Sequence, residues 1–382
     1  MTIKNIKETL LQNLINIPGW RTNRKIVVIE SDDWGSVRMP SHEVYLKCLK
    51  AGYRVDKNPY ERYDALESET DLRLLFDLLQ SYTDYLGNNP IITANCVVAN
   101  PDFDKIRDSD FKEYHYELVT ETFKKYPEHA KSFELWKTGN DNRIFRMQFH
   151  GREHLNVSLF MRDLQQGVKH THFGFNNFMP GCINLGDTNI GNIYVEATKS
   201  SSPQDNIEKL KIILEGLDIF EILLGYKSES YIPTNYYWNY DNNSFVKQKG
   251  VIIFQGVARM KETIPIGRKK YRYHYFGEVN EDNQIYLIRN CSFEPSFFET
   301  KDVVKDCLSS IKSAFFFDKP AVISSHRLNY IGFIDRNNRD RTLILLDELI
   351  GAILKKWPDV EFMSSDMLGN YIIESKLQNE IL

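Results

Sequence analysis

Short apolar runs recur along the chain and alternate with stretches in which apolar residues return at helical spacing. Apolar runs predict buried strands at residues 25–29, 91–98, 146–149, 231–232, 251–254, 321–323 and 360–363, and an additional strand at 285–288. Helical patterns lie between them at 72–79, 206–224 and 342–354. This alternation predicts an α/β fold with a mainly parallel sheet. The pattern alone does not distinguish an open sheet from a closed barrel.

Three stretches depart from this alternation. The first 24 residues carry Leu10, Leu11, Leu14 and Ile15 ahead of Pro18, which predicts a separate amphipathic N-terminal helix. Residues 160–200 are rich in Gly, Asn, His and Phe without a clear period, and residues 257–300 alternate Lys, Arg, Tyr and Phe. We expect both to be insertions at about 160–200 and 257–300 in a single α/β unit that spans residues 25–382.

Composition narrows the class of protein. The chain has 382 residues, 42% of them hydrophobic, and a formal net charge of −4. Without a clustered basic excess, no nucleic-acid partner is expected. No stretch of about 18 apolar residues predicts a membrane span, and the N-terminus lacks a secretory pattern. The five cysteines form no CxxC pair and read as reduced thiols, so we expect a cytoplasmic protein. The oligomeric state is not predicted.

Two adjacent acids, Asp32 and Asp33, lie in the segment 30–35, which directly follows the first predicted strand. Active sites of parallel α/β folds collect at the C-terminal ends of strands, so this position favours a catalytic or metal-binding role. The alternative is an exposed turn or a helix cap, in which aspartate is also common.

Histidines follow two further strands. His150 and His154 come after the strand at 146–149, and this spacing on one helical turn would let both imidazoles share a metal ion. His326 follows the strand at 321–323. Each histidine taken singly could be structural, but three strand ends with these residue types indicate a hydrolytic site. Catalytic zinc takes three protein ligands and leaves one position open, and Asp33, His150 and His154 would supply that set.

The order of these motifs resembles that of the NodB-homology polysaccharide deacetylases. The sequence ESDDWG at 30–35 is similar to the family's T-F-D-D-G, HGREH at 150–154 to H-S/T-x-x-H, and ISSH at 323–326 to its late L-x-H. The resemblance extends from residue 25 to about residue 370. It implies a distorted (β/α)7 barrel with insertions on its rim. It also implies that Asp33, His150 and His154 hold the metal, that Asp32 is the general base and that His326 is the general acid.

Two family motifs have no obvious counterpart. The R-x-P-x-x motif should lie near Pro233, where no arginine precedes the proline, and the D-x-x-D-W motif should follow residues 251–254, where Gln255 and Gly256 stand. The arginine that orients the catalytic aspartate and the acid that tunes the catalytic histidine are therefore unassigned. Candidate replacements are Arg152, Arg327 and Asp366.

The resemblance implies a metal-dependent hydrolase that deacetylates an acetylated sugar or oligosaccharide precursor. Zinc suits two imidazoles and a carboxylate, as do cobalt, nickel, manganese and iron. We expect substrate contacts from Trp34, Arg152, Asn235 and Tyr236, with a backbone N–H near Asn235–Tyr236 holding the oxyanion. The alternatives are a metal-dependent hydrolase of another amide or glycosidic bond in the same superfamily, or a carbohydrate-binding barrel without catalysis.

Overall fold

A computed structural model describes residues 13–181, 193–263 and 270–381 of the chain, and its centre is a nine-stranded sheet. The strands pair in the order β11-β8-β6-β5-β2-β1-β13-β12, with β14 also pairing with β1. Every pairing within this sheet is parallel. The strands are β1 (Lys25–Trp34), β2 (Ile92–Val97), β5 (Phe145–Gly151), β6 (Ser230–Tyr231), β8 (Ile253–Gly256), β11 (Ile285–Ile288), β12 (Cys291–Ser292), β13 (Ala321–His326) and β14 (Val360–Phe362).

The sheet curls into a barrel because its two ends are joined by a very short link. Strands β11 and β12 stand at opposite ends of the pairing order, yet only Arg289 and Asn290 separate them in sequence. The Arg289 N–H donates to the carbonyl of Gly256 in β8, and the Asn290 N–H donates to that of Val322 in β13. Backbone hydrogen bonds from this link therefore connect the two ends of the sheet. The expected distorted (β/α) barrel is confirmed.

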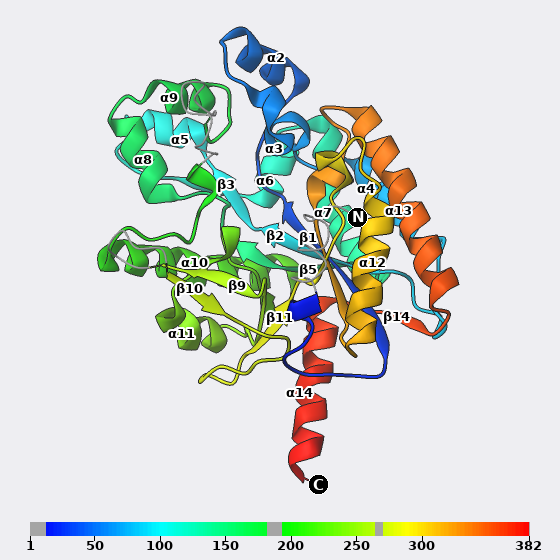
Figure 1. The fold of residues 1–382 in the computed structure, drawn as a ribbon. Helices are drawn as coiled ribbons and strands as arrows, with labels where there is room; N and C mark the ends of the chain where they lie inside the picture. Colours follow the sequence, from blue (N-terminus) through cyan, green and yellow to red (C-terminus); the bar gives the residue numbers. More distant parts are fainter. Residues whose placement is uncertain (1–12, 182–192, 264–269, 382) are drawn as a thin grey trace.

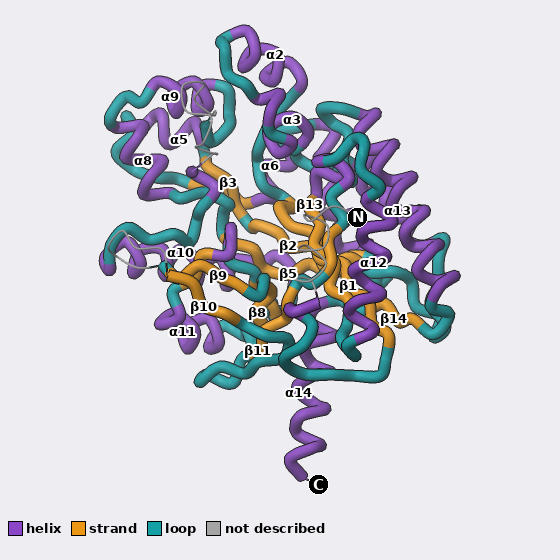
Figure 2. The backbone as a smooth tube through the Cα atoms, in the orientation of Figure 1, coloured by secondary structure: helices purple, strands orange, loops and turns teal. Residues whose placement is uncertain are grey.

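Helices surround this sheet (Figures 1 and 2). They bury the outer face of strands such as β1, whose residues after Lys25 are all buried, as is usual for parallel strands covered on both faces. The principal helices are α4 (Glu69–Gln80), α7 (Ser132–Asp141), α10 (Pro203–Leu224), α12 (Val303–Phe316), α13 (Arg336–Lys356) and α14 (Ser365–Ile381). Local sequence sets their ends: Ser68 and Asp71 form a capping box at the start of α4, and Gly225 ends α10 in a left-handed conformation.

Two groups of short elements stand at the end of the barrel where β1 and β5 finish. Between β1 and α4 lie α2 (His42–Lys50), η1 (Val55–Lys57) and α3 (Pro59–Tyr63), which the sequence patterns did not predict. A second lobe, at the upper left of Figure 1, contains α5 (Phe103–Asp108), α8 (Val157–Gln165) and α9 (Lys169–Asn176). This lobe has its own small apolar core, which includes Phe103, Phe160 and Phe175.

The three departures from strand–helix alternation have different outcomes. Residues 1–12 of the expected N-terminal helix lie outside the described residues, as do 182–192 in the stretch 160–200. The stretch 257–300 was expected to be an insertion, but its second half contains β11 and β12 of the barrel sheet. Only its first half leaves the barrel, as β9 (Arg259–Glu262) and β10 (Lys270–Tyr273), which form a three-stranded sheet with β7 (Tyr237–Trp238); residues 264–269 are not described.

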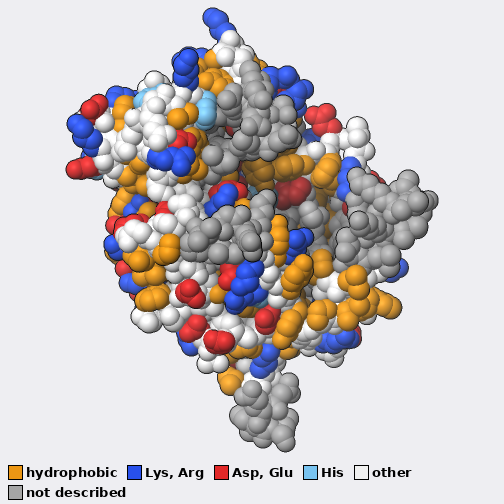
Figure 3. All heavy atoms as spheres, turned by 60° about the vertical axis from the view of Figure 1, so that its left-hand side comes forward, with side chains coloured by type: hydrophobic (Ala, Val, Ile, Leu, Met, Phe, Trp, Pro, Cys, Tyr) orange, Lys and Arg blue, Asp and Glu red, His pale blue; other side chains and the backbone are white. Residues whose placement is uncertain are grey.

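The remaining elements are short. They comprise β3 (Ala99–Pro101), β4 (Tyr116–Leu118), α6 (Val119–Lys124), α11 (Asn243–Gln248), η2 (Pro127–His129), η3 (Ile193–Val195), η4 (Thr234–Tyr236), η5 (Tyr240–Asn242), η6 (Pro295–Phe297) and η7 (Arg327–Asn329). Across the described ranges, none of the helices has the length and apolar content needed to cross a membrane. On the face shown in Figure 3, acidic and basic side chains are interspersed among apolar ones.

Candidate metal centre and active site

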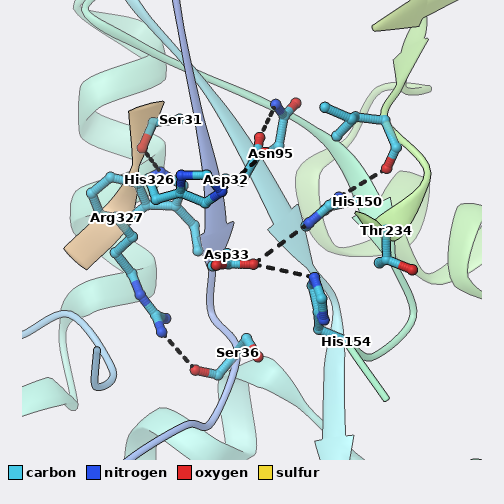
Figure 4. A network of polar contacts seen from close by, with 12 residues as sticks. Ser31, Asp32, Asp33, Ser36, Asn95, His150, His154, Thr234, His326 and Arg327 are labelled. Atoms are coloured by element: carbon cyan, nitrogen blue, oxygen red, sulfur yellow. Dashed lines mark hydrogen bonds and ion pairs between the residues drawn. The ribbon is translucent and has the colours of Figure 1, made fainter. Parts of the chain in front are cut away.

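The C-terminal ends of β1, β5 and β13 meet at one cavity of about 540 Å³. Asp32 of β1 pairs in register with His326 of β13, so these two side chains start from adjacent positions of the sheet. The lining of this cavity includes all five residues assigned to catalysis or metal binding from the sequence: Asp32, Asp33, His150, His154 and His326. Figure 4 shows four of them approaching from three separate strands, with His154 coming from the segment after β5.

Asp33, His150 and His154 bring three potential ligand atoms within 4.8 Å of one another. The Oδ1 atom of Asp33 lies 3.6 Å from Nε2 of His150 and 3.3 Å from Nε2 of His154 (Figure 4). All three side chains are buried. Asp33 has a φ of 78°, in the left-handed region that aspartate tolerates better than most residues. The histidines are not on a helical turn as expected, because His150 belongs to strand β5 and His154 lies in the irregular segment before α8.

The protonation of these groups fits a bound cation. Nδ1 of His150 is 2.8 Å from the carbonyl oxygen of Ile232 and donates to it, so in the neutral imidazole the lone pair is on Nε2. Burial, followed by the charge of Arg38, holds the pKa of His154 well below its usual value and keeps this imidazole neutral. Lone pairs and a carboxylate oxygen in contact repel each other unless a cation lies between them. Tetrahedral zinc places its nitrogen and oxygen ligands about 3.3 Å apart, close to the separations found here.

The carboxylate of Asp32 is held by a buried arginine that the sequence patterns did not identify. Arg289 donates from Nη1 to Oδ2 over 2.7 Å and from Nη2 to Oδ1 over 2.6 Å, while its Nε donates to Glu30. Asn95 adds a hydrogen bond to Oδ1. Burial acts to raise the pKa of Asp32, but the charge and hydrogen bonds of Arg289 outweigh it and lower this pKa to about 2. Asp32 is thus an oriented carboxylate beside the three metal-ligand candidates.

His326 is paired with a second carboxylate, Glu294, which lies between β12 and η6. Nδ1 of His326 is 2.6 Å from Oε1 of Glu294. Burial acts to lower the pKa of His326, but the charge of Glu294 and this hydrogen bond raise it to about 9. His326 is therefore an imidazolium at neutral pH, with Nε2 3.8 Å from Oδ2 of Asp32.

Arg289 contacts Asp32 and Glu294 contacts His326, which are the two partners that the sequence motifs left unassigned, and the three candidates expected there pair elsewhere. Arg152 pairs with Glu153 and Glu215, Arg327 with Asp64 and Glu67, and Asp366 with Arg146. Both replacements come from the segment RNCSFE at 289–294, directly after strand β11. A charged residue soon after an apolar run is the same signal that singled out Asp32, but residues 285–288 lie in a stretch that the sequence pattern predicts as an insertion.

The four residues expected to contact substrate divide into two pairs. Asn235 and Tyr236 line the cavity, both with positive φ, and the N–H of Tyr236 donates to the carbonyl of Pro233. Trp34 does not line it: the indole is fully buried, donates to Ser31 and packs against Phe145. Arg152 lines a separate cavity of about 290 Å³ beside α10. Trp34 is a core residue because the strand is irregular at Asp33, where φ is positive and the pairing of β1 with β2 shifts register, and the indole beyond it packs on Phe145.

Comparison with known proteins gives matches only among solved structures. No family model matches the chain, and no curated protein matches it significantly. A 4-alpha-glucanotransferase from Thermococcus litoralis is 9% identical with a TM-score of 0.45, over 90% of this chain and 40% of that one. The chain thus spans less than half the length of that enzyme.

Two other solved structures match over most of both chains. A protein described as a "probable polysaccharide deacetylase" from Pseudomonas aeruginosa is 10% identical, with a TM-score of 0.45 over 91% of each chain. The Puue allantoinase is 11% identical, with a TM-score of 0.44 over 92% of this chain and 91% of that one. The matches therefore include a deacetylase of the kind that the sequence motifs resemble. At these identities and scores they carry no functional argument, which rests on the site itself.

Proposed function

We propose that this chain is a metal-dependent hydrolase that removes an acetyl group from a sugar or oligosaccharide. The observation that carries the proposal is the arrangement of the 540 Å³ cavity. Two groups for proton transfer lie side by side there. Asp32 is a carboxylate that can accept a proton, and His326 is an imidazolium that can donate one. Both are next to a buried set of two imidazoles and one carboxylate.

Asp33, His150 and His154 would hold the metal in this proposal. Zinc is the leading candidate, and cobalt, nickel, manganese and iron suit the same donor set. A divalent ion bound there supplies Lewis acidity, which lowers the pKa of water and polarises an acyl carbonyl. The carbonyl of Ile232 keeps His150 in the tautomer that presents Nε2, as partners of metal-binding histidines usually do.

The chain's own residues handle the protons. Asp32 accepts a proton from the attacking water, and Arg289 keeps its two oxygens in a fixed plane while this occurs. The backbone N–H of Asn235 is the candidate donor to the developing oxyanion, because the N–H of Tyr236 is already used by Pro233. His326 supplies the proton that the departing amine or alcohol needs. Asp32 gains one proton and His326 loses one during turnover. Proton exchange of both side chains with water then restores the starting state.

Acetate release from N,N′-diacetylchitobiose tests the proposal. The wild-type protein should release acetate, lose this activity on treatment with a chelator and regain it when Zn²⁺ is restored. Release of single sugars without acetate would instead support the glycosidase alternative, and binding without either product would support the non-catalytic alternative. Asp32→Asn is the matched control, because it should leave the metal in place and stop turnover.

A further inference from the structure

The catalytic histidine already has a partner on its free nitrogen. The hydroxyl oxygen of Tyr60 lies 3.0 Å from Nε2 of His326. The other ring nitrogen, Nδ1, is committed to Glu294, so Nε2 is the only atom from which His326 can deliver a proton. A leaving group in the cavity therefore reaches that proton either through Tyr60 or after displacing it.

The sequence around Tyr60 positions the hydroxyl in this place. Tyr60 is in the first turn of α3, where the Asn58 side chain caps the helix by accepting from the Tyr60 N–H over 3.1 Å and Pro59 is at the first helical position. Its ring meets the ring of Phe297 edge to face with centroids 5.2 Å apart, and that of His326 at the same distance. Asn58 and Tyr60 both line the cavity. The helix comes from the segment between β1 and α4 rather than from the barrel.

The protonation states leave the hydroxyl proton of Tyr60 available to the cavity. Burial, with the charges of Glu294 and Asp33, raises the pKa of Tyr60 well above its ordinary value, so the hydroxyl stays neutral. The imidazolium of His326 has no lone pair on Nε2 and must donate to the Tyr60 oxygen. The O–H of Tyr60 must then donate to a different acceptor. Because Tyr60 lines the cavity, a substrate bound there can provide this acceptor.

We infer that Tyr60 is a catalytic residue that relays the proton of His326 to the leaving atom of the substrate. This inference rests on the proposed hydrolase function. As the bond between the acyl carbon and the leaving nitrogen or oxygen breaks, its electron pair takes the hydroxyl proton of Tyr60. The Tyr60 oxygen takes the Nε2 proton in the same step. Tyr60 ends as it began, a neutral hydroxyl, and His326 ends as a neutral imidazole.

The relay predicts that Tyr60 matters only when the leaving group needs a proton. We would compare N,N′-diacetylchitobiose, whose amine must be protonated to leave, with 4-nitrophenyl acetate, whose phenolate leaves without a proton. Tyr60→Phe should lower kcat on the amide by about 100-fold and on the aryl ester by less than about threefold, because general acid catalysis contributes on that scale. His326→Gln should show the same selective loss. Tyr63→Phe is the matched control, since Tyr63 is in the same helix but does not line the cavity.

The outcomes separate this inference from the proposed function. Equal losses on both substrates would reduce Tyr60 to a structural role. An unchanged or higher kcat on the amide would show that substrate displaces Tyr60, and either result overturns the relay. A wild-type protein that hydrolyses neither probe with metal present would contradict the proposed function itself.

A measurement on the wild type covers the case in which Tyr60→Phe does not fold. If two protons move in the same step, a plot of kcat on the amide against the deuterium fraction of the solvent is curved. A straight line would contradict the relay.

Discussion

Replacing Glu294 with glutamine tests the contact that sets the charge of His326. The substitution keeps the shape of the side chain but removes its charge. Glu294 accepts from His326 through Oε1 and from Asn329 through Oε2, whereas a glutamine can accept through only one of its two terminal atoms. The imidazolium form thus loses its ion pair, and one of the two hydrogen bonds becomes a contact between donors.

The size of the effect follows from the pKa of His326. The difference between about 9 and the ordinary 6.5 corresponds to about 3 kcal/mol in favour of the charged form. At pH 8 the wild-type imidazole would be about 90% protonated, and one with the ordinary pKa about 3%, so Glu294→Gln should lower the rate about 30-fold. At pH 5.5 both proteins would be largely protonated, and their rates should agree within about a factor of two. Since the acid form is the active one, the difference grows as pH rises.

The assay is the pH dependence of kcat/KM for acetate release between about pH 5.5 and 10. The alkaline limb should move from near 9 towards 6.5 in Glu294→Gln, because burial then lowers the pKa of His326 and only the charges of Asp32 and Asp33 still oppose it. Glu299→Gln is the control, since Glu299 is an exposed acid nearby that contacts Arg62. The same pairing contributes folding stability that is present below 6.5 and lost as pH rises through 9, so unfolding free energies should differ most at acid pH. An alkaline limb that stays near 9 in the variant would refute the role of Glu294.

The remaining predictions concern the metal ligands and the buried ion pairs. His154→Ala should lose bound metal by elemental analysis, whereas Asp32→Asn should retain it and lose turnover; equal metal contents in the two variants would contradict the division of roles. Arg289→Ala leaves two carboxylates, Glu30 and Asp32, buried without their partner. It should lower the free energy of unfolding in urea by about 3–5 kcal/mol, and a loss below about 1 kcal/mol would contradict this.

Most strands of the barrel could be predicted because a buried parallel strand is usually a mainly apolar run, which can be recognised without its partners. The runs at 25–29, 146–149 and 321–323 coincide with β1, β5 and β13. The polar residues that end these runs are then candidates for one site, because parallel strands place their C-terminal ends at one edge. This local signal was sufficient to single out Asp32, Asp33, His150, His154 and His326.

Arg289, Glu294 and Tyr60 could not be assigned from the pattern, each for a physical reason. Arg289 and Glu294 are next to the site only because the sheet closes on itself and brings β11 and β12 to its two edges. Tyr60 reaches His326 from a helix 266 positions earlier in the chain. Trp34 shows the converse: it follows Asp32 and Asp33 in sequence, but the irregular backbone at Asp33 and the packing against Phe145 place its side chain in the core.

The sequence by itself determined most of the barrel strands and which strand ends carry acids and imidazoles, because hydrophobic periodicity and residue chemistry are local properties. Only the tertiary structure determined which charged side chains contact one another. The closure of the barrel brings Arg289 to Asp32 and Glu294 to His326, and those pairings set the protonation states on which the chemistry depends. Electrostatic interactions act through space between groups far apart in the chain, so no local pattern encodes them.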